Sequence, residues 1–208
     1  MKKFKLFLGL TIAMTAGCII FGDSALAAEQ PENKAYLINE STGEVEELQV
    51  REVTTNLPSS RSVMTDSGGS ETSTFEIFAP IEVPEDSKLS RTSSGSNKTS
   101  GGVTAKINVN YDINSKGDQI RVNSYNGSWT PSSGMYIISG RAAGVHSGFV
   151  AGGKSMTKYP TGNSFNYNTG WGYNARLLGG NSPRTWVDCV IKVSGMSGQH
   201  KLVLEHTF

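Results

Sequence analysis

Cysteine is almost absent from this chain of 208 residues, which contains only Cys18 and Cys189. Cys18 lies in an apolar N-terminal run, so the rest of the chain holds one thiol and forms no internal disulfide. A secreted domain of this kind depends on a packed core for its stability. Cys189 shares its strand parity with Val187, Ile191 and Val193, and we therefore expect a buried, unreactive thiol.

Catalytic signatures are missing as well. The three histidines, His146, His200 and His206, do not have a metal-binding spacing, and no G-x-S-x-G elbow occurs. Few carboxylates follow residue 102, and two of these, Asp112 and Asp118, fall in or beside a predicted turn. We therefore expect a protein that is not an enzyme and that has no cofactor and no metal. An enzyme whose site is assembled only in space remains an alternative.

The segment from Asp112 to Asp118 resembles the start of a calcium loop, with oxygen-bearing side chains at alternate positions and Gly117 at the sixth. The fifth position is Lys116 and the twelfth is Asn123, neither of which suits calcium, and no helices flank the loop. The sequence therefore favours a polar hairpin loop over a calcium site.

Only one long apolar run is present, from Leu6 to Phe21, and it follows three lysines near the N-terminus. Ala25-Leu26-Ala27 has the A-x-A pattern of a cleavage site, so residues 1–27 are predicted to be a secretory signal peptide. A transmembrane anchor needs about 20 apolar residues, and a lipoprotein cleaved before Cys18 is a further alternative. We expect secretion, without a transmembrane anchor, from a Gram-positive bacterium.

Charge divides the predicted mature chain into an acidic front and a basic back. Residues 28–102 contain 13 acidic and 6 basic residues, whereas residues 103–208 contain 4 acidic and 10 basic residues. We predict an acidic segment (28–86), a linker rich in Ser, Gly and Thr (87–102) and a basic domain (103–208). The split predicts a weak contact between the two halves that is sensitive to salt.

The acidic segment contains a predicted hairpin over residues 35–53, with a short helix over 44–53 as the alternative. Residues 58–73 are predicted to form a flexible loop because they are rich in Ser and Gly. Residues 74–83 are predicted to form a strand, which Pro80 would confine to an edge of a sheet or interrupt.

Short runs of alternating apolar residues cover the basic half, and its 15 glycines and its prolines separate them. The clearest run extends from Arg184 to Ser194, in which Val187, Cys189, Ile191 and Val193 share one face and Trp186, Asp188, Val190 and Lys192 share the other. This pattern predicts a central strand of an antiparallel sheet. The fold class is therefore all-β, an antiparallel β-sandwich or barrel of about seven to nine short strands, preceded by the acidic segment and linker.

Aromatic residues interleaved with asparagines are the best indication of a binding site. Exposed aromatic rings beside amide side chains suit sugar rings, which have apolar faces and hydroxyl rims. We expect Trp129 to be the most exposed, because it lies beside a turn-like Asn-Gly-Ser segment. Packing of these aromatics in the core is the alternative. The predicted ligand-binding residues are Trp129, Tyr159, Tyr167, Trp171 and Tyr173.

These features predict a secreted, non-catalytic binding protein for a carbohydrate or anionic component of the cell surface. The partner is then a cell-wall polysaccharide or an anionic membrane surface. Nucleic acid is not expected, because the basic residues do not form a dense cluster. The alternative is a membrane-active or toxin-like effector whose acidic segment is a pro-segment removed by cleavage in residues 87–102.

Overall fold

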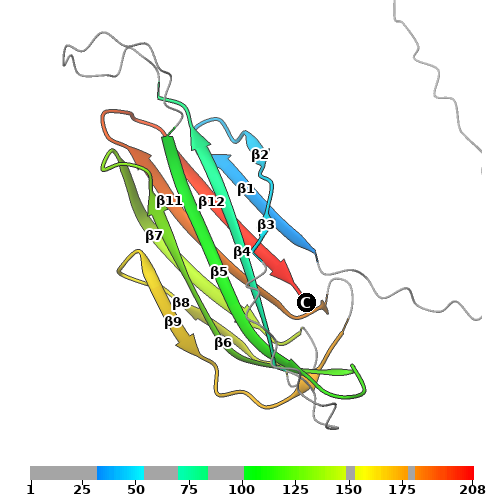
Figure 1. The fold of residues 1–208 in the computed structure, drawn as a ribbon. Coiled ribbons are helices and arrows are strands. Elements are labelled where there is room, and N and C mark those ends of the chain that lie inside the picture. The colour runs from blue at the N-terminus through cyan, green and yellow to red at the C-terminus, as the bar shows by residue number, and fades with distance from the viewer. Residues whose placement is uncertain (1–31, 54–69, 84–100, 149–152, 178–180) are drawn as a thin grey trace, which may run out of the picture.

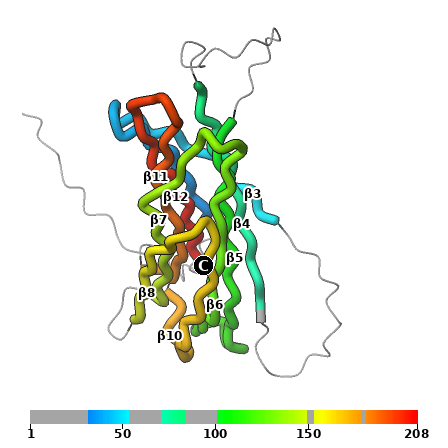
Figure 2. The backbone as a smooth tube through the Cα atoms, turned by 90° about the vertical axis from the view of Figure 1, so that its left-hand side faces the viewer, coloured from blue at the N-terminus to red at the C-terminus, as the bar shows by residue number. Residues whose placement is uncertain are grey.

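The computed structural model describes residues 32–53, 70–83, 101–148, 153–177 and 181–208. These residues form two antiparallel sheets packed face to face, with no helix in the described ranges (Figures 1 and 2). The predicted all-β sandwich is therefore confirmed, and the sheets do not close into a barrel. Eight strands, β5 to β12, come from the chain after residue 100, which agrees with the predicted number.

The first sheet, here called the terminal sheet, contains the first and the last described strands. Its strand order is β2-β1-β12-β11-β7-β8. The strands are β1 (Asn33–Asn39), β2 (Val45–Glu47), β7 (Tyr136–His146), β8 (Ser155–Lys158), β11 (Arg184–Val193) and β12 (Gln199–Thr207). The predicted central strand from Arg184 to Ser194 is confirmed, because β11 lies between β7 and β12.

The second sheet, here called the hairpin sheet, contains successive strands of the chain in the order β10-β6-β5-β4-β3, and β9 also pairs with β6. Long strands dominate it, and β9 and β10 pair with different parts of the same edge of β6. The strands are β3 (Arg51–Glu52), β4 (Ser70–Ile81), β5 (Gly101–Ile113), β6 (Gln119–Pro131), β9 (Ser164–Asn168) and β10 (Asn174–Ala175).

Strand alternation directs one face of each sheet into a shared core. In β11 the residues of one parity are buried, and Cys189 among them is fully enclosed. The predicted burial of Cys189 is therefore confirmed, and this burial raises the pKa of its thiol to about 12. The β-branched and aromatic side chains of the inward parity fill the space between the two sheets.

The front half of the chain contributes strands to both sheets. β1 pairs with β12 through seven residue pairs, and β4 pairs with β5 through twelve. The predicted hairpin over residues 35–53 is present as β1 and β2, rather than the alternative helix. The boundary predicted at residue 103 falls inside β5. Strand β3 pairs with β4 only at Glu76 and Phe75. Among the described strands, β4 is therefore the edge of its sheet at Pro80, as predicted.

Charge attraction is not the main contact between the front and back halves. Each of the four ion pairs in the described ranges joins two residues of the same half, for example Arg51 with Glu76 and Arg184 with Glu205. The halves instead share ladder hydrogen bonds and one apolar core, to which Leu37 and Phe75 contribute. This contact differs in kind from the weak, salt-sensitive contact predicted from the charge split.

Several sequence-based predictions fall outside the described residues. These are the signal peptide (1–27), most of the flexible loop (58–73) and most of the linker (87–102). The described part of each of the last two segments is strand, because residues 70–73 begin β4 and residues 101–102 begin β5. Within the described ranges there is no apolar helix of membrane-spanning length.

His206 connects the two sheets and both halves of the chain. Its ring lies on the core side of β12, stacks on Phe75 of β4 at a centroid distance of 4.0 Å and meets Phe208 edge-on at 4.7 Å. Its Nδ1 lies 2.7 Å from Oδ1 of Asn33 in β1, which is a hydrogen bond with Nδ1–H as donor. Burial lowers the pKa of His206 to about 4.

We expect His206 to make the fold less stable in acid. The His206 ring takes up a proton near pH 6.5 in the unfolded chain and near pH 4 in the folded chain. The stability that the neutral, buried ring contributes is therefore fully present above pH 6.5 and is lost as the pH falls from 6.5 to 4. The expected loss by pH 4 is about 3 kcal/mol. Urea unfolding of His206→Gln should show a smaller fall in unfolding free energy between pH 7 and pH 4 than the wild type. An unchanged pH dependence in this variant, with His200→Gln as the control, would contradict the assignment.

We also expect β1 to be held by core packing and not by charge. Leu37 is 5 % exposed and points into the core, whereas its neighbour Ile38 points outward and is only partly covered. Leu37→Ala should therefore lower the unfolding free energy by about 3 kcal/mol, and Ile38→Ala by less than about 1 kcal/mol. Both values should stay the same in molar sodium chloride, as measured by urea unfolding. Equal effects of the two variants, or a Leu37→Ala effect that changes strongly with salt, would show that β1 is held differently.

Candidate ligand-binding face

Trp129, predicted to be the most exposed aromatic, is only 1 % exposed, so that prediction is wrong. It belongs to the inward parity of β6, opposite Ala105 of β5. Its ring packs against Phe165 at a centroid distance of 5.4 Å. The Asn-Gly-Ser segment before it, which resembles a turn in the sequence, continues β6 instead, and Gly127 makes room for the Phe165 ring.

The other four predicted aromatics do not form one row. Tyr167 is half-buried and stacks on Phe165 at 5.6 Å, and Trp171 is half-buried against the core. The chain turns after β9 at Gly170, which has a φ of +67°, so the shared parity of the sequence is lost there. Only Tyr159 and Tyr173, which are 77 % and 40 % exposed, are open to solvent, and Tyr173 lies 5.0 Å from the Arg121 guanidinium.

The amide side chains that accompany these aromatics in the sequence do come together, on the outer face of the hairpin sheet. Cross-strand pairing places them in two adjacent rows over β4, β5, β6 and β9. One row is Thr72, Asn110, Ser124 and Asn168; the other is Thr74, Asn108, Asn126 and Asn166. We call these eight residues the amide face; Thr74 is only 5 % exposed, and the other seven are partly or fully exposed.

Hydrogen bonds between neighbouring strands hold the amide face in place. Asn108 Nδ2 donates to Asn126 Oδ1 at 2.6 Å, and Asn110 Nδ2 donates to Ser124 Oγ at 3.1 Å. Thr72 Oγ1 donates to Asn110 Oδ1. Because a side-chain amide has two N–H donors and an oxygen that accepts two hydrogen bonds, these bonds use only part of its capacity. The face is thus ordered and can still bind polar groups.

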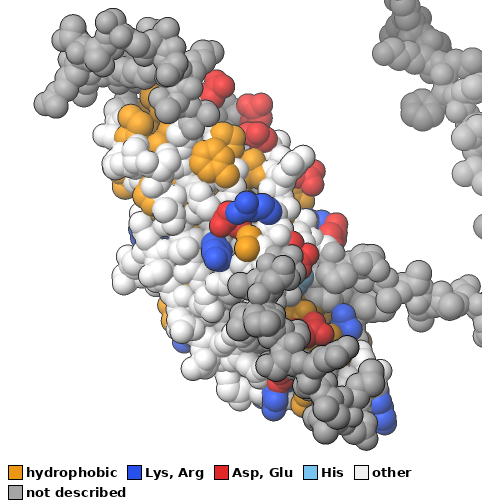
Figure 3. All heavy atoms as spheres, in the orientation of Figure 1, with side chains coloured by type: hydrophobic (Ala, Val, Ile, Leu, Met, Phe, Trp, Pro, Cys, Tyr) orange, Lys and Arg blue, Asp and Glu red, His pale blue; other side chains and the backbone are white. Residues whose placement is uncertain are grey.

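The amide face carries no charge. The row beside it contains Glu76, Lys106, Ser128 and Ser164, and Glu76 is held at 2.6 Å by Arg51 of β3. Figure 3 views this side of the molecule, where much of the described surface is white and a group of acidic and basic side chains lies near the middle. An uncharged surface with many donors and acceptors suits a ligand that is itself neutral and rich in hydroxyl groups.

An exposed aromatic lies farther along the same outer face. Phe78 of β4 is 45 % exposed and has the same outward parity as Thr72 and Thr74. Its ring lies against Gly102 of β5, where an added Cβ would come within 3.0 Å of the ring and 2.0 Å of the Ala79 carbonyl oxygen. The glycine lets the ring approach the sheet closely. An apolar contact surface is therefore available two rows from the amides.

The alternation in the sequence already places several residues of this face on the outward side of their strands, although other residues were predicted to bind the ligand. Asn108 and Asn110 are outward in the alternation of residues 103–111, and Phe78 lies in the predicted strand over residues 74–83. Their grouping depends on the register of β4 with β5 and of β9 with β6. In the amide face those pairs join positions that are 34 to 44 residues apart in the chain, so no local pattern reveals them.

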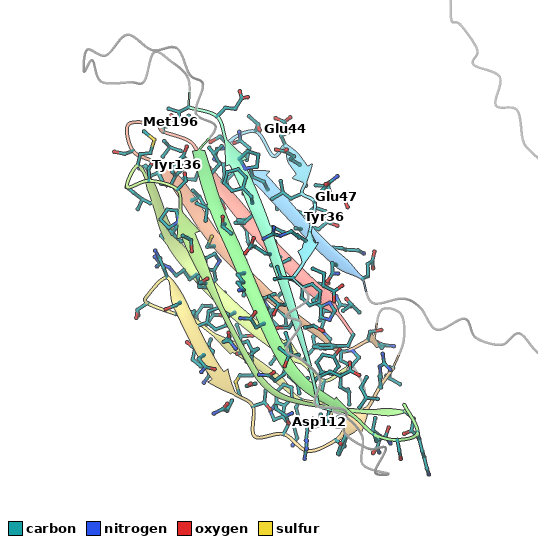
Figure 4. All side chains as sticks on the ribbon, viewed as in Figure 1. Tyr36, Glu44, Glu47, Asp112, Tyr136 and Met196 are labelled. Carbon is teal, nitrogen blue, oxygen red and sulfur yellow. The ribbon has the colours of Figure 1, made fainter. Side chains whose placement is uncertain are left out.

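The loop that resembled a calcium site is the turn between β5 and β6, as the hairpin prediction indicated. Asp112 lies at one end of the sandwich, far from the labelled Tyr136 and Met196 (Figure 4). Its carboxylate accepts hydrogen bonds from Arg121 and Asn123, and Asn114 donates to Asp118 at 2.6 Å. Among the described residues, no group of three or more His, Cys, Asp or Glu side chains is arranged to hold a metal ion.

We accordingly expect calcium to leave the stability of the protein unchanged. Arg121 and Asn114 occupy the oxygens that an ion would need, so millimolar calcium chloride or EDTA should shift the melting temperature by less than about 1 °C. Differential scanning fluorimetry measures this shift, with magnesium chloride as the ionic-strength control. A larger shift that calcium alone produces would reverse the assignment.

The chain was compared with protein-family models, curated proteins and solved structures, and none of them matches it.

Proposed function

We propose that the protein is a secreted, non-catalytic binding protein whose ligand is a neutral cell-surface polysaccharide. The amide face, eight uncharged hydrogen-bonding side chains in two rows across four strands, is the observation on which this proposal rests. The sequence pattern of residues 1–27 supports secretion. Of the two ligand classes expected from the sequence, the neutral face favours carbohydrate over an anionic surface.

The spacing of the face suits an extended chain of sugars. Neighbouring strands lie about 4.8 Å apart, close to the length of one pyranose ring in an extended polysaccharide. A chain crossing β4, β5, β6 and β9 along the row from Thr72 to Asn168 would therefore meet one amide or hydroxyl side chain per strand. Each sugar hydroxyl both donates and accepts, and the Asn side chains offer partners for both roles.

Phe78 supplies the apolar part of such a site. The C–H face of a pyranose stacks on aromatic rings, and the ring of Phe78 is fixed against Gly102 before any ligand binds. Rigid contact groups lose little conformational entropy on binding. Phe78 of β4 thus takes the place of Trp129 of β6, which was predicted from the sequence. The expected interaction, stacking of a sugar ring on an aromatic ring, is the same.

The strand pairing gives no support to the alternative of a membrane-active domain with a removable acidic segment. Release of the front half would take β1 from the terminal sheet and β4 from the hairpin sheet. It would expose core side chains such as Leu37, Phe75 and Ile77, each at most 5 % exposed in the intact fold. Exposing that much apolar surface is costly, at roughly 25 cal/mol per Å².

The test is a pull-down of the protein with insoluble cellulose, chitin and peptidoglycan sacculi. We expect binding to at least one of these polymers that persists in molar sodium chloride, because the face is neutral. Asn108→Ala combined with Asn126→Ala should weaken it about thirtyfold, since each substitution removes a hydrogen bond that contributes about 1 kcal/mol.

Lys192→Ala is the matched control, because Lys192 is exposed on the terminal sheet and should not affect binding. Failure to bind any of the three polymers would reject the proposal. So would binding that molar salt abolishes, or a double variant that binds as tightly as the control.

A further inference from the structure

The opposite outer face, on the terminal sheet, carries a second aromatic contact. Trp186 of β11 points away from the core and is half-buried. Its ring lies over Gly144 of β7, where an added Cβ would come within 2.0 Å of Cζ2, 2.4 Å of Cε2 and 2.5 Å of Cη2. Since three ring atoms are this close to one point above Gly144, the indole lies flat on the sheet and its other face points outward.

Polar side chains lie on both sides of this ring in the same cross-strand row. The row runs Lys34, Glu205, Trp186, Gly144 and Thr157 across β1, β12, β11, β7 and β8. Glu205 Oε1 accepts a hydrogen bond from Arg184 Nη1 at 3.2 Å, and both side chains are about one quarter exposed. A carboxylate and a guanidinium that are hydrogen-bonded to each other therefore lie on the same outer face as the half-buried indole.

A second ring lies beside the indole on the same outer face. The His146 imidazole lies 6.1 Å from the indole, and the Gly148 N–H donates to His146 Nδ1 at 3.2 Å. Tyr36 of β1 shares the outward face, two strands away from Trp186 and two residues farther along, which corresponds to about 12 Å between their backbones. Figure 4 labels Tyr36 on β1, near Glu47 of the neighbouring β2. Two aromatic contacts at this separation suit a chain of sugar rings better than one small molecule.

We propose that Trp186, with Glu205 and Arg184, forms a second glycan-binding site, and that the protein bridges two polysaccharide chains. The indole face stacks on a pyranose, while Glu205 accepts from its hydroxyls and Arg184 donates to them. The class of ligand rests on the proposed function of the amide face, but the site itself does not share a residue with that face.

The two sites lie on opposite outer surfaces of the sandwich, which would let one molecule bind two polysaccharide chains. The amide face is on the outer surface of the hairpin sheet and the Trp186 site is on the outer surface of the terminal sheet (Figure 2). The backbones of two packed sheets are about 10 Å apart. One extended polysaccharide cannot lie on both surfaces at once. A single molecule with both sites therefore connects two chains, and many molecules connect particles that carry such chains.

The experiment measures agglutination of particles coated with the polysaccharide that the pull-down identifies. Light scattering first establishes whether the protein is a monomer. Trp186→Leu keeps an apolar side chain over Gly144 but has no ring, and Trp186→Tyr restores a ring. We expect the Leu variant to bind the particles without agglutinating them, and the Tyr variant to agglutinate them. Circular dichroism checks that both variants fold.

The amide-face double variant Asn108→Ala/Asn126→Ala separates the two proposals. We expect it to retain binding through Trp186 and to lose agglutination, and we expect the triple variant with Trp186→Leu to lose binding. Agglutination by Trp186→Leu at the wild-type level would overturn the second site. So would complete loss of binding in the amide double variant, which would leave the proposed function in place. If the wild type binds no polysaccharide, both proposals fail together.

Discussion

Burial of two apolar sheet faces against each other is the interaction on which the rest of this structure depends. Cys189, the thiol within the described ranges, is free and enclosed, so no disulfide supports the fold there. The core takes one parity of each long strand, with Trp129, Tyr125 and Phe75 as its largest fully buried side chains. Once that parity is fixed, the residues of the other parity face outward, and many of them are exposed to solvent.

The same constraint explains how an acidic and a basic half form one unit. Strand β1, which pairs with β12, places Ala35 and Leu37 in the core. Strand β4, which pairs with β5, places Phe75 and Ile77 there. The ion pairs of the described residues stay within each half. The opposite net charges are therefore a property of the surface, and burial with ladder hydrogen bonding provides the cohesion between the halves.

The two outer faces of the sandwich differ in chemistry because different strands supply them. The hairpin sheet presents neutral amides and hydroxyls in register, stabilised by bonds such as Asn108 to Asn126. The terminal sheet presents an indole beside the Arg184–Glu205 pair. In both sheets an outward aromatic ring lies over a glycine, Phe78 over Gly102 and Trp186 over Gly144. Because neither glycine has a side chain, each ring can lie close to the backbone of its own sheet.

Alternation along single strands was enough to determine the fold class, the inward face of β11, the buried Cys189 and the hairpin at β1 and β2, because these depend on neighbours in the chain. The position of Trp129 was mistaken, since a local Asn-Gly-Ser pattern was overridden by continuous pairing of β6 with β5. Only the tertiary structure decided that Asn166 lies beside Asn126, that Gly144 lies beneath Trp186 and that β4 joins β5. Each of these contacts depends on register between strands distant in sequence, and register is set by packing of the whole sandwich.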